Sequence, residues 1–239
     1  MKAIYKRELK SYFQSMIGYA FVAFMMAFVG IYFKAYNLNM GYPYFSYVLS
    51  STLFIFMIAV PVLTMKSFAE ERKSKTDQLL LTAPVSVTGV VLGKFFAMVT
   101  VFAIPVVMSC VYPLIIKMQG TAYLKVDYAA ILVYFAIGCV YIAIGMFLSS
   151  LTESQIIAAV STFAVLLVFN MWSGLIEFLP DGTIGTWLKE FLGKLDFASL
   201  LSGLISNSLL DISGLMLCIS LVFLFVFLTI QTIQKRRWS

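Results

Sequence analysis

A charged segment followed by a leucine cluster is the part of this chain best suited to binding another protein. Residues 66–77 carry mixed charges, three consecutive leucines follow at 79–81, and Pro84 ends any helix there. A short helix with exposed leucines beside charges is a form that docks into a groove of a partner. In the alternative, the leucines return to the membrane and pack below the next apolar stretch. The candidate residues are Glu70, Glu71, Arg72, Leu79, Leu80 and Leu81.

The sequence lacks side chains that most enzymes and metal sites need. It contains no histidine, which excludes imidazole as a base, a proton shuttle or a metal ligand. Its three cysteines stand singly within apolar runs, so redox and metal chemistry are not expected. No Walker A loop is present, so the chain is not expected to hydrolyse ATP itself. Any energy for transport must therefore arrive through a partner.

The composition is that of a membrane protein. Of 239 residues, 62% are hydrophobic and 12% are charged, whereas soluble domains carry about 25% charged residues. Such a chain cannot build the polar surface of a soluble fold. Ordinary cytosolic enzymes, secreted disulfide-rich domains and disordered chains are thereby excluded.

Six apolar stretches without any Asp, Glu, Lys or Arg are each long enough to cross a bilayer as a helix. They are residues 17–33, 47–65, 95–116, 128–149, 154–176 and 212–234. They are continuously apolar rather than alternating, which favours helices over a β-barrel. We therefore expect an all-α polytopic membrane protein with six transmembrane helices in a single domain, 1–239. Charge-free spans offer no site for a coupling ion or a proton relay.

The basic residues predict the orientation in the membrane. With a cytoplasmic N-terminus, 12 of the 17 Lys and Arg residues fall on the cytoplasmic side, for net charges of +7 inside and −1 outside. An excess of Lys and Arg in short loops marks the cytoplasmic face. We expect a multi-pass protein of the inner, or cytoplasmic, membrane with both termini in the cytoplasm.

Residues 1–16 are too polar to span the membrane and predict an amphipathic helix. Lys2, Lys6 and Lys10 form a row at helical spacing, opposite an apolar face. We expect this helix to lie along the inner leaflet, with Lys6, Arg7 and Glu8 as its interfacial residues. Two compatible roles fit this helix: it transmits motion from a cytoplasmic partner into the first span, or it serves as a surface anchor that sets the topology.

Two short connections carry further candidates. Ser86 is placed to cap the helix that follows Pro84. Glu153 lies in the tight turn between the fourth and fifth spans, where its charge can stabilise a helix N-terminus. That role alone would explain Glu153, although it could also contact a partner.

Gly145 and Ser149, at the end of the fourth span, are small residues four positions apart, which allows close helix packing.

Residues 177–211 should be extracellular, yet they alternate apolar groups with glycines and charges. A loop of about 35 residues without internal structure is uncommon. We expect an extracellular re-entrant helical hairpin between spans 5 and 6, because backbone at membrane depth must be buried in protein or face a water-filled cavity. Such a hairpin could gate an exit pathway or close a dimer as a lid.

Across its whole length the chain resembles the ABC-2 type permeases. The loop pattern of that family is matched by Glu70-Glu71-Arg72, the leucine cluster and Gly93-Lys94, with Thr76 and Pro84 at the expected places. The resemblance implies that residues 76–83 form the coupling helix that docks into a separate ATPase subunit. It makes Thr76, Pro84 and Lys94 further candidates for ATPase coupling. Glu153, which could contact a partner from its turn, is another candidate for ATPase coupling.

A narrower resemblance, to gliding-motility-type (GldF-like) permeases, rests on the two ends of the chain. Residues 3–13, the Ile17-Gly18-Tyr19 step, and the C-terminal segments 195–211 and 228–238 carry it. Asn207 and Ser208 depart from this pattern where a glycine usually stands, which affects the expected shape of the hairpin.

The resemblance implies a permease subunit of an ABC exporter, working as a homo- or heterodimer beside membrane lipids. ATP and Mg would be bound by the partner ATPase and not by this chain, and no nucleic acid is expected as a partner. The cargo is unidentified, and an amphiphilic molecule suits apolar walls. The alternative is a non-transporting mechanotransmission module that drives an extracytoplasmic accessory protein. A passive channel is disfavoured because no polar rings line the spans.

Overall fold

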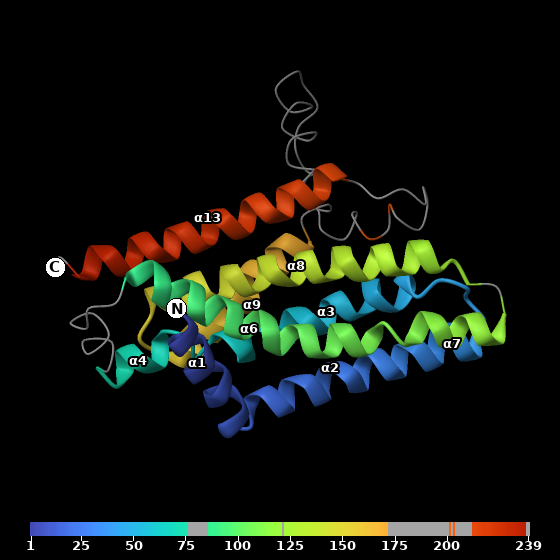
Figure 1. Ribbon diagram of the computed structural model, residues 1–239, viewed down its shortest axis with the longest axis horizontal. Helices are drawn as coiled ribbons and strands as arrows, with labels where there is room; N and C mark the ends of the chain where they lie inside the picture. The colour runs from blue at the N-terminus through green and yellow to red at the C-terminus, as the bar shows by residue number, and fades with distance from the viewer. Residues whose placement is uncertain (76–85, 121, 172–200, 202, 204–211, 238–239) are drawn as a thin grey trace, which may run out of the picture.

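A computed structural model describes residues 1–75, 86–120, 122–171, 201, 203 and 212–237 of the protein (Figure 1). The described residues form helices and connecting turns, with no strand among them. In chain order the helices are α1 (Lys2–Gln14), α2 (Ile17–Phe33), the π-helix η1 (Lys34–Asn39), α3 (Ser46–Thr64), α4 (Ala69–Lys73), α6 (Val87–Ser109), α7 (Tyr112–Gln119), α8 (Leu124–Leu151), α9 (Gln155–Asn170) and α13 (Ile212–Arg237).

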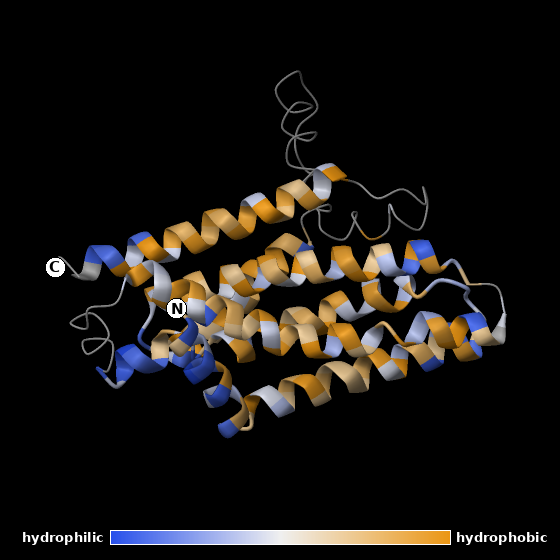
Figure 2. Cartoon of the chain, viewed as in Figure 1, coloured by the Kyte–Doolittle hydropathy of each residue, from blue (hydrophilic) through white to orange (hydrophobic). Residues whose placement is uncertain are grey.

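The long helices form one bundle whose middle is apolar and whose polar residues gather at its two ends (Figure 2). The N-terminus, α4 and the C-terminal end of α13 lie at one end, which we call the α4 end (Figure 1). The opposite end, the α7 end, contains η1, α7 and the starts of α3 and α8. An apolar band between two polar ends is the distribution that a bilayer requires.

The prediction of an all-α polytopic membrane protein is confirmed. Five helical segments are long and apolar enough to cross a membrane: Ile17–Asn39, Ser46–Lys73, Val87–Met118, Leu124–Leu151 and Ile212–Lys235. The shorter apolar helix α9 occupies the first part of the predicted span 154–176, of which residues 172–176 lie outside the described residues.

Helices α3 and α8 form the centre of the bundle. In the most apolar part of each of these two helical segments, 67% of the residues are buried. The corresponding share is 28% in the segment Ile17–Asn39 and 22% in Ile212–Lys235. Small residues let the central helices approach closely, as expected: a side chain at Gly145 of α8 would collide with Thr64 of α3. The exposed apolar surfaces of α2 and α13 are suited to contact lipid.

Several helices extend beyond the charge-free stretches and take in charged residues, and two of these residues are buried. Helix α6 begins at Val87 rather than at residue 95, and the Ser86 hydroxyl caps it by accepting a hydrogen bond from the Gly89 N–H at 3.3 Å. Lys94 consequently lies inside α6. Asp127 lies in the first turn of α8, where its Oδ1 accepts a hydrogen bond from the Phe45 N–H at 2.8 Å. Both side chains are buried within the protein.

The predicted amphipathic helix is α1, and its apolar face packs on the bundle. Ile4 lies against Gly93 of α6, and the Tyr12 hydroxyl donates to the Leu63 carbonyl of α3 at 3.2 Å. Burial and the nearby Glu8 carboxylate raise the pKa of Tyr12, which keeps its hydroxyl protonated as a donor. The row Lys2, Lys6 and Lys10 is exposed, as the sequence predicts.

Two predicted segments lie outside the described residues. The expected extracellular hairpin, 177–211, is among them apart from Leu201 and Gly203. The whole of the expected coupling helix, 76–83, with Thr76, Leu79, Leu80 and Leu81, lies outside the described residues too, as does Pro84.

Candidate functional site

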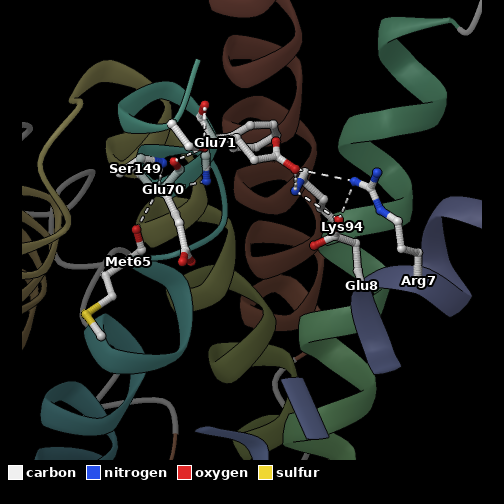
Figure 3. A network of polar contacts seen from close by, with 10 residues as sticks. Arg7, Glu8, Met65, Glu70, Glu71, Lys94 and Ser149 are labelled. Atoms are coloured by element: carbon white, nitrogen blue, oxygen red, sulfur yellow. Dashed lines mark hydrogen bonds and ion pairs between the residues drawn. The ribbon is translucent and has the colours of Figure 1, made fainter. Parts of the chain in front are cut away.

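The short helix α4 at the end of α3 is positioned by a serine of α8. The Ser149 hydroxyl accepts hydrogen bonds from the backbone N–H groups of Phe68 and Ala69, both at 3.2 Å. It also donates to the Met65 carbonyl at 3.2 Å (Figure 3). Free N–H and C=O groups at helix ends need such partners. One side chain therefore holds the end of α3 and the beginning of α4 against α8.

Four charged side chains from α1, α4 and α6 meet beside α4, and we call them the charge cluster: Arg7, Glu8, Glu71 and Lys94 (Figure 3). Lys94 Nζ lies 2.9 Å from Glu71 Oε1 and 3.1 Å from Glu8 Oε1. Arg7 Nη2 lies 2.9 Å from Glu8 Oε1 and 3.4 Å from Glu71 Oε1. Each carboxylate oxygen thus contacts both cations, so the four groups close a ring of opposite charges.

Lys94 is the buried centre of the charge cluster. Its side chain is 3% exposed, against 12% for Glu8, 18% for Glu71 and 56% for Arg7. Its ammonium also lies over the Phe68 ring, 5.2 Å from the centroid. A charge removed from water must keep its partners, because an unpaired buried charge costs several kcal/mol. The cluster therefore resists any motion that separates α1, α4 or α6 from the other two.

A second ion pair joins α4 to the turn between α8 and α9. Arg72 Nη2 lies 2.9 Å from Glu153 Oε1, and its Nη1 donates to the Ser150 carbonyl at 3.4 Å. Glu153 makes this bond two residues before Gln155, the first residue of α9, and its stabilisation of that helix N-terminus stays a prediction. Helix α4 is thereby tied to four neighbours, namely α1, α6, α8 and the α8–α9 turn.

The structure places the sequence-predicted residues in three groups. Arg7, Glu8, Glu71 and Lys94 form the charge cluster, and Arg72 and Glu153 form the adjacent pair. Glu70 and Lys6 are exposed, with Glu70 Oε2 lying 3.8 Å from Lys66 Nζ. The leucine cluster follows α4 outside the described residues, as do Thr76 and Pro84.

From the sequence, Ser149 was predicted only to allow close helix packing. Its hydrogen bonds to the backbone at the start of α4 were not predicted. The contact of Tyr5 was not predicted either: its hydroxyl lies 3.0 Å from the Thr100 hydroxyl of α6. The only sequence signal for Ser149 is a polar residue at the end of an apolar span, which is too common to be diagnostic. Within the described residues, no group of three His, Cys, Asp or Glu side chains could hold a metal ion.

The model of one protein family, described as an ABC-2 family transporter protein, matches residues 2–230. The chain belongs to the ABC-2 transporter family. The match covers all the described helices apart from the last residues of α13. No match was found among curated proteins.

Family membership makes the chain a transmembrane component of an ABC transporter rather than its ATPase. ABC-2 permeases generally associate with an ABC ATPase and form dimers. Together with the apolar helices, the match shows a multi-pass membrane protein. The narrower resemblance to gliding-motility-type permeases stays a prediction.

The Arg72–Glu153 pair is expected to contribute little to stability. Glu153 is 70% exposed, and exposed ion pairs contribute about 0–1 kcal/mol. Glu153→Gln should therefore lower the free energy of unfolding in mixed detergent micelles by less than about 1 kcal/mol. Thr152→Ala, in the same turn, is the matched control. A loss of several kcal/mol for Glu153→Gln would show that the pair is a principal stabilising contact.

Proposed function

We propose that this protein is the permease subunit of an ABC-2 exporter that moves an amphiphilic cargo with ATP hydrolysed by a separate subunit. The observation that carries the proposal is the position of α4, which directly precedes the expected coupling segment 76–83 and is bound to four other parts of the bundle. A force on that segment would reach α1, α6 and α8 through contacts that are already made.

The α4 end is proposed to face the cytoplasm, as the basic residues predict. The two carboxylate-paired cations and the exposed lysine row of α1 lie at this end, in accord with an excess of basic residues on the cytoplasmic side. The protein would then reside in the inner, or cytoplasmic, membrane with both termini inside. The ATPase, with its ATP and Mg, would bind beside α4.

In the proposed mechanism, closure of two ATPase subunits pushes the coupling segments of two permease copies. Because the charge cluster and Ser149 hold α4 against the bundle, α4 cannot move alone. The push would tilt α1, α6 and α8 together and change the packing at the interface between the two copies. Apolar helix surfaces at that interface suit a lipid-like cargo, which would leave past the segment 177–211.

The leucine cluster provides the test. Changing Leu79, Leu80 and Leu81 to Asp is expected to abolish co-purification with the ATPase and to reduce transport-coupled ATP hydrolysis at least tenfold, because three charges cannot enter an apolar groove. Lys10→Asp, on the exposed face of α1, is the control for added negative charge and should leave the complex intact. An intact, active complex in the leucine variant would refute the docking assignment.

A second measurement separates transport from mechanotransmission. The complex reconstituted in vesicles should hydrolyse ATP and move a fluorescent amphiphile between leaflets. ATP hydrolysis without movement of lipid or amphiphile, combined with an ATP-dependent change in binding of an extracytoplasmic protein, would overturn the exporter assignment in favour of a mechanotransmission module.

A further inference from the structure

Helix α1 runs crosswise to the long helices, so its two flanks face different parts of the bundle (Figure 1). On one flank, Arg7 Nη2 lies 3.4 Å from Glu71 Oε1 of α4, at the polar α4 end. On the other flank, the Tyr5 hydroxyl lies 3.0 Å from the hydroxyl of Thr100, near the middle of the apolar segment Val87–Met118. The Tyr5 side of α1 therefore faces the apolar band, and the Arg7 side faces the polar end.

The Tyr5 side of α1 continues as an apolar surface. Leu9 and Phe13 follow Tyr5 at steps of four residues, which places all three on one side of the helix. Leu9 and Phe13 are half-buried against the core of the bundle. The Phe13 ring also contacts the Tyr19 ring of α2 edge-on, with 5.0 Å between the centroids, and Tyr19 is 60% exposed. This surface thus joins the exposed apolar surface of α2, which is suited to contact lipid.

Two lysines interrupt the apolar surface of α1. Lys2 stands seven positions before Leu9 and Lys6 seven positions before Phe13, a separation of about 20° around a helix in each case. Lys10, by contrast, directly follows Leu9 and points about 100° away from it. Lys2 and Lys6 are both exposed. We call the side of α1 that carries Lys2, Lys6, Leu9 and Phe13 the lysine face.

The charge cluster does not neutralise the lysine face. Glu8 is the only acidic residue of α1, and it stands two positions after Lys6, about 160° around the helix from it. Its Oε1 instead lies 3.1 Å from Lys94 Nζ and 2.9 Å from Arg7 Nη2. Neither Lys2 nor Lys6 belongs to an ion pair with another described residue. The lysine face therefore presents two ammonium groups whose counter-charge is not supplied by α1, α4 or α6.

The position of these ammonium groups favours lipid phosphate as the counter-charge. A lysine on a membrane-facing side extends its aliphatic stem along apolar residues and places its ammonium group in the headgroup layer. The anion present in that layer is the phosphate of a phospholipid. A zwitterionic lipid carries its own cation beside the phosphate, whereas an anionic lipid does not. Two lysines without a carboxylate partner should therefore select the anionic lipid.

We infer that the lysine face binds the headgroup of an anionic phospholipid. The ammonium groups of Lys2 and Lys6 bind the phosphate oxygens, and the acyl chains lie along the apolar side chains of the same face. The sequence grouped Lys6 with Arg7 and Glu8 as interfacial residues, whereas the structure turns Arg7 and Glu8 away from it into the charge cluster. This site goes beyond the proposed function, because it depends on neither the ATPase nor the cargo.

The test uses the full-length protein in nanodiscs that contain equal amounts of phosphatidylglycerol and phosphatidylcholine, with one lipid at a time as a photoactivatable analogue. After illumination and digestion, mass spectrometry measures labelling of the peptide that contains residues 1–16. Phosphatidylglycerol is expected to label this peptide several-fold more than phosphatidylcholine. Lys2→Gln and Lys6→Gln should each lower this preference by about fivefold at most, and the double variant should abolish it.

Lys117→Gln combined with Lys125→Gln is the matched control, because it removes the same charge from exposed positions at the α7 end. It should leave the labelling of residues 1–16 unchanged. Lys2 and Lys6 are exposed, so an unfolding curve that matches the wild type will confirm that their variants fold.

Three results would overturn the inference. The first is equal labelling of residues 1–16 by the two lipids in the wild type. The second is an equal loss of preference in the α7-end control, which would indicate attraction to the net charge of the protein rather than a site on α1. The third is an unchanged lipid preference in the Lys2 and Lys6 double variant together with loss of ATPase binding, which would assign the two lysines to an acidic surface of the partner.

Discussion

Lys94→Met is expected to lower the free energy of unfolding by about 3–5 kcal/mol, because it leaves two carboxylates without their shared cation in a site that water barely reaches. Glu8 and Glu71, 12% and 18% exposed, would then lie side by side with the exposed Arg7 still in contact with both. The measurement is unfolding of the purified protein in mixed detergent micelles. ATP hydrolysis by the assembled complex should fall in parallel if the cluster transmits force.

A compensated variant distinguishes lost charge pairing from lost packing. Lys94→Met combined with Glu8→Gln and Glu71→Gln removes both signs of charge while it keeps similar volumes. Replacing a buried ion pair by neutral groups is often close to neutral for stability, so the triple variant should regain most of the lost free energy. The triple variant should recover its free energy of unfolding, but ATP hydrolysis by the assembled complex should stay low. The reason is that neutral side chains do not bind α1 and α4 to α6 as firmly as the charged ones. A triple variant less stable than Lys94→Met would contradict this account.

Gly138→Ala is expected to lower the free energy of unfolding by about 1–3 kcal/mol, the usual effect of overpacking a core. A Cβ atom at Gly138 of α8 would collide with the Phe102 ring of α6. That ring is fully buried, with the Phe56 centroid at 4.5 Å and the Phe135 centroid at 5.7 Å, both stacked on it. It therefore has little room to give way. The same unfolding experiment provides the measurement.

Gly30→Ala is the matched control, because it makes the same change in the last turn of α2, from which the chain continues into η1. The nearest atom to its new Cβ is the Tyr112 hydroxyl at 3.8 Å, an ordinary contact, and alanine is favoured over glycine in a helix by about 1 kcal/mol. Gly30→Ala should thus be neutral or stabilising. Phe102→Leu should relieve part of the loss in Gly138→Ala, so that the double variant costs less than the sum of the two. Strict additivity would exclude the predicted collision.

Much of the fold could be read from local sequence. Helix α2, Ile17–Phe33, has the same bounds as the predicted first span, and the chain then continues through Lys34 as the π-helix η1. The start of α6 could not be found in this way. Lys94 interrupts the apolar run, so a charge-free criterion begins the span after it, whereas the helix continues past Lys94 because Glu8 and Glu71 neutralise the charge.

The candidate site, too, could be predicted only in part from the sequence. Glu71, Arg72 and Lys94 were candidates from the loop pattern, yet nothing in that pattern placed Glu8 of α1 beside them. Glu71 and Lys94 stand 23 positions apart, and Arg7 and Glu71 stand 64 apart. Contacts over such separations depend on how helices cross, and a single sequence does not encode crossing angles in any local pattern. The bond between Arg72 and Glu153 was not predicted for the same reason, since the two residues stand 81 positions apart.

Composition and charge distribution were enough to predict a helical membrane protein, because solvation by lipid acts on each stretch of about 20 residues separately. Only the tertiary structure decided which charged side chains meet and which serine holds α4, because both depend on the packing of α1, α6 and α8 around α3. Those contacts arise only when close helix approach at glycines such as Gly93 and Gly145 brings distant side chains within hydrogen-bond distance.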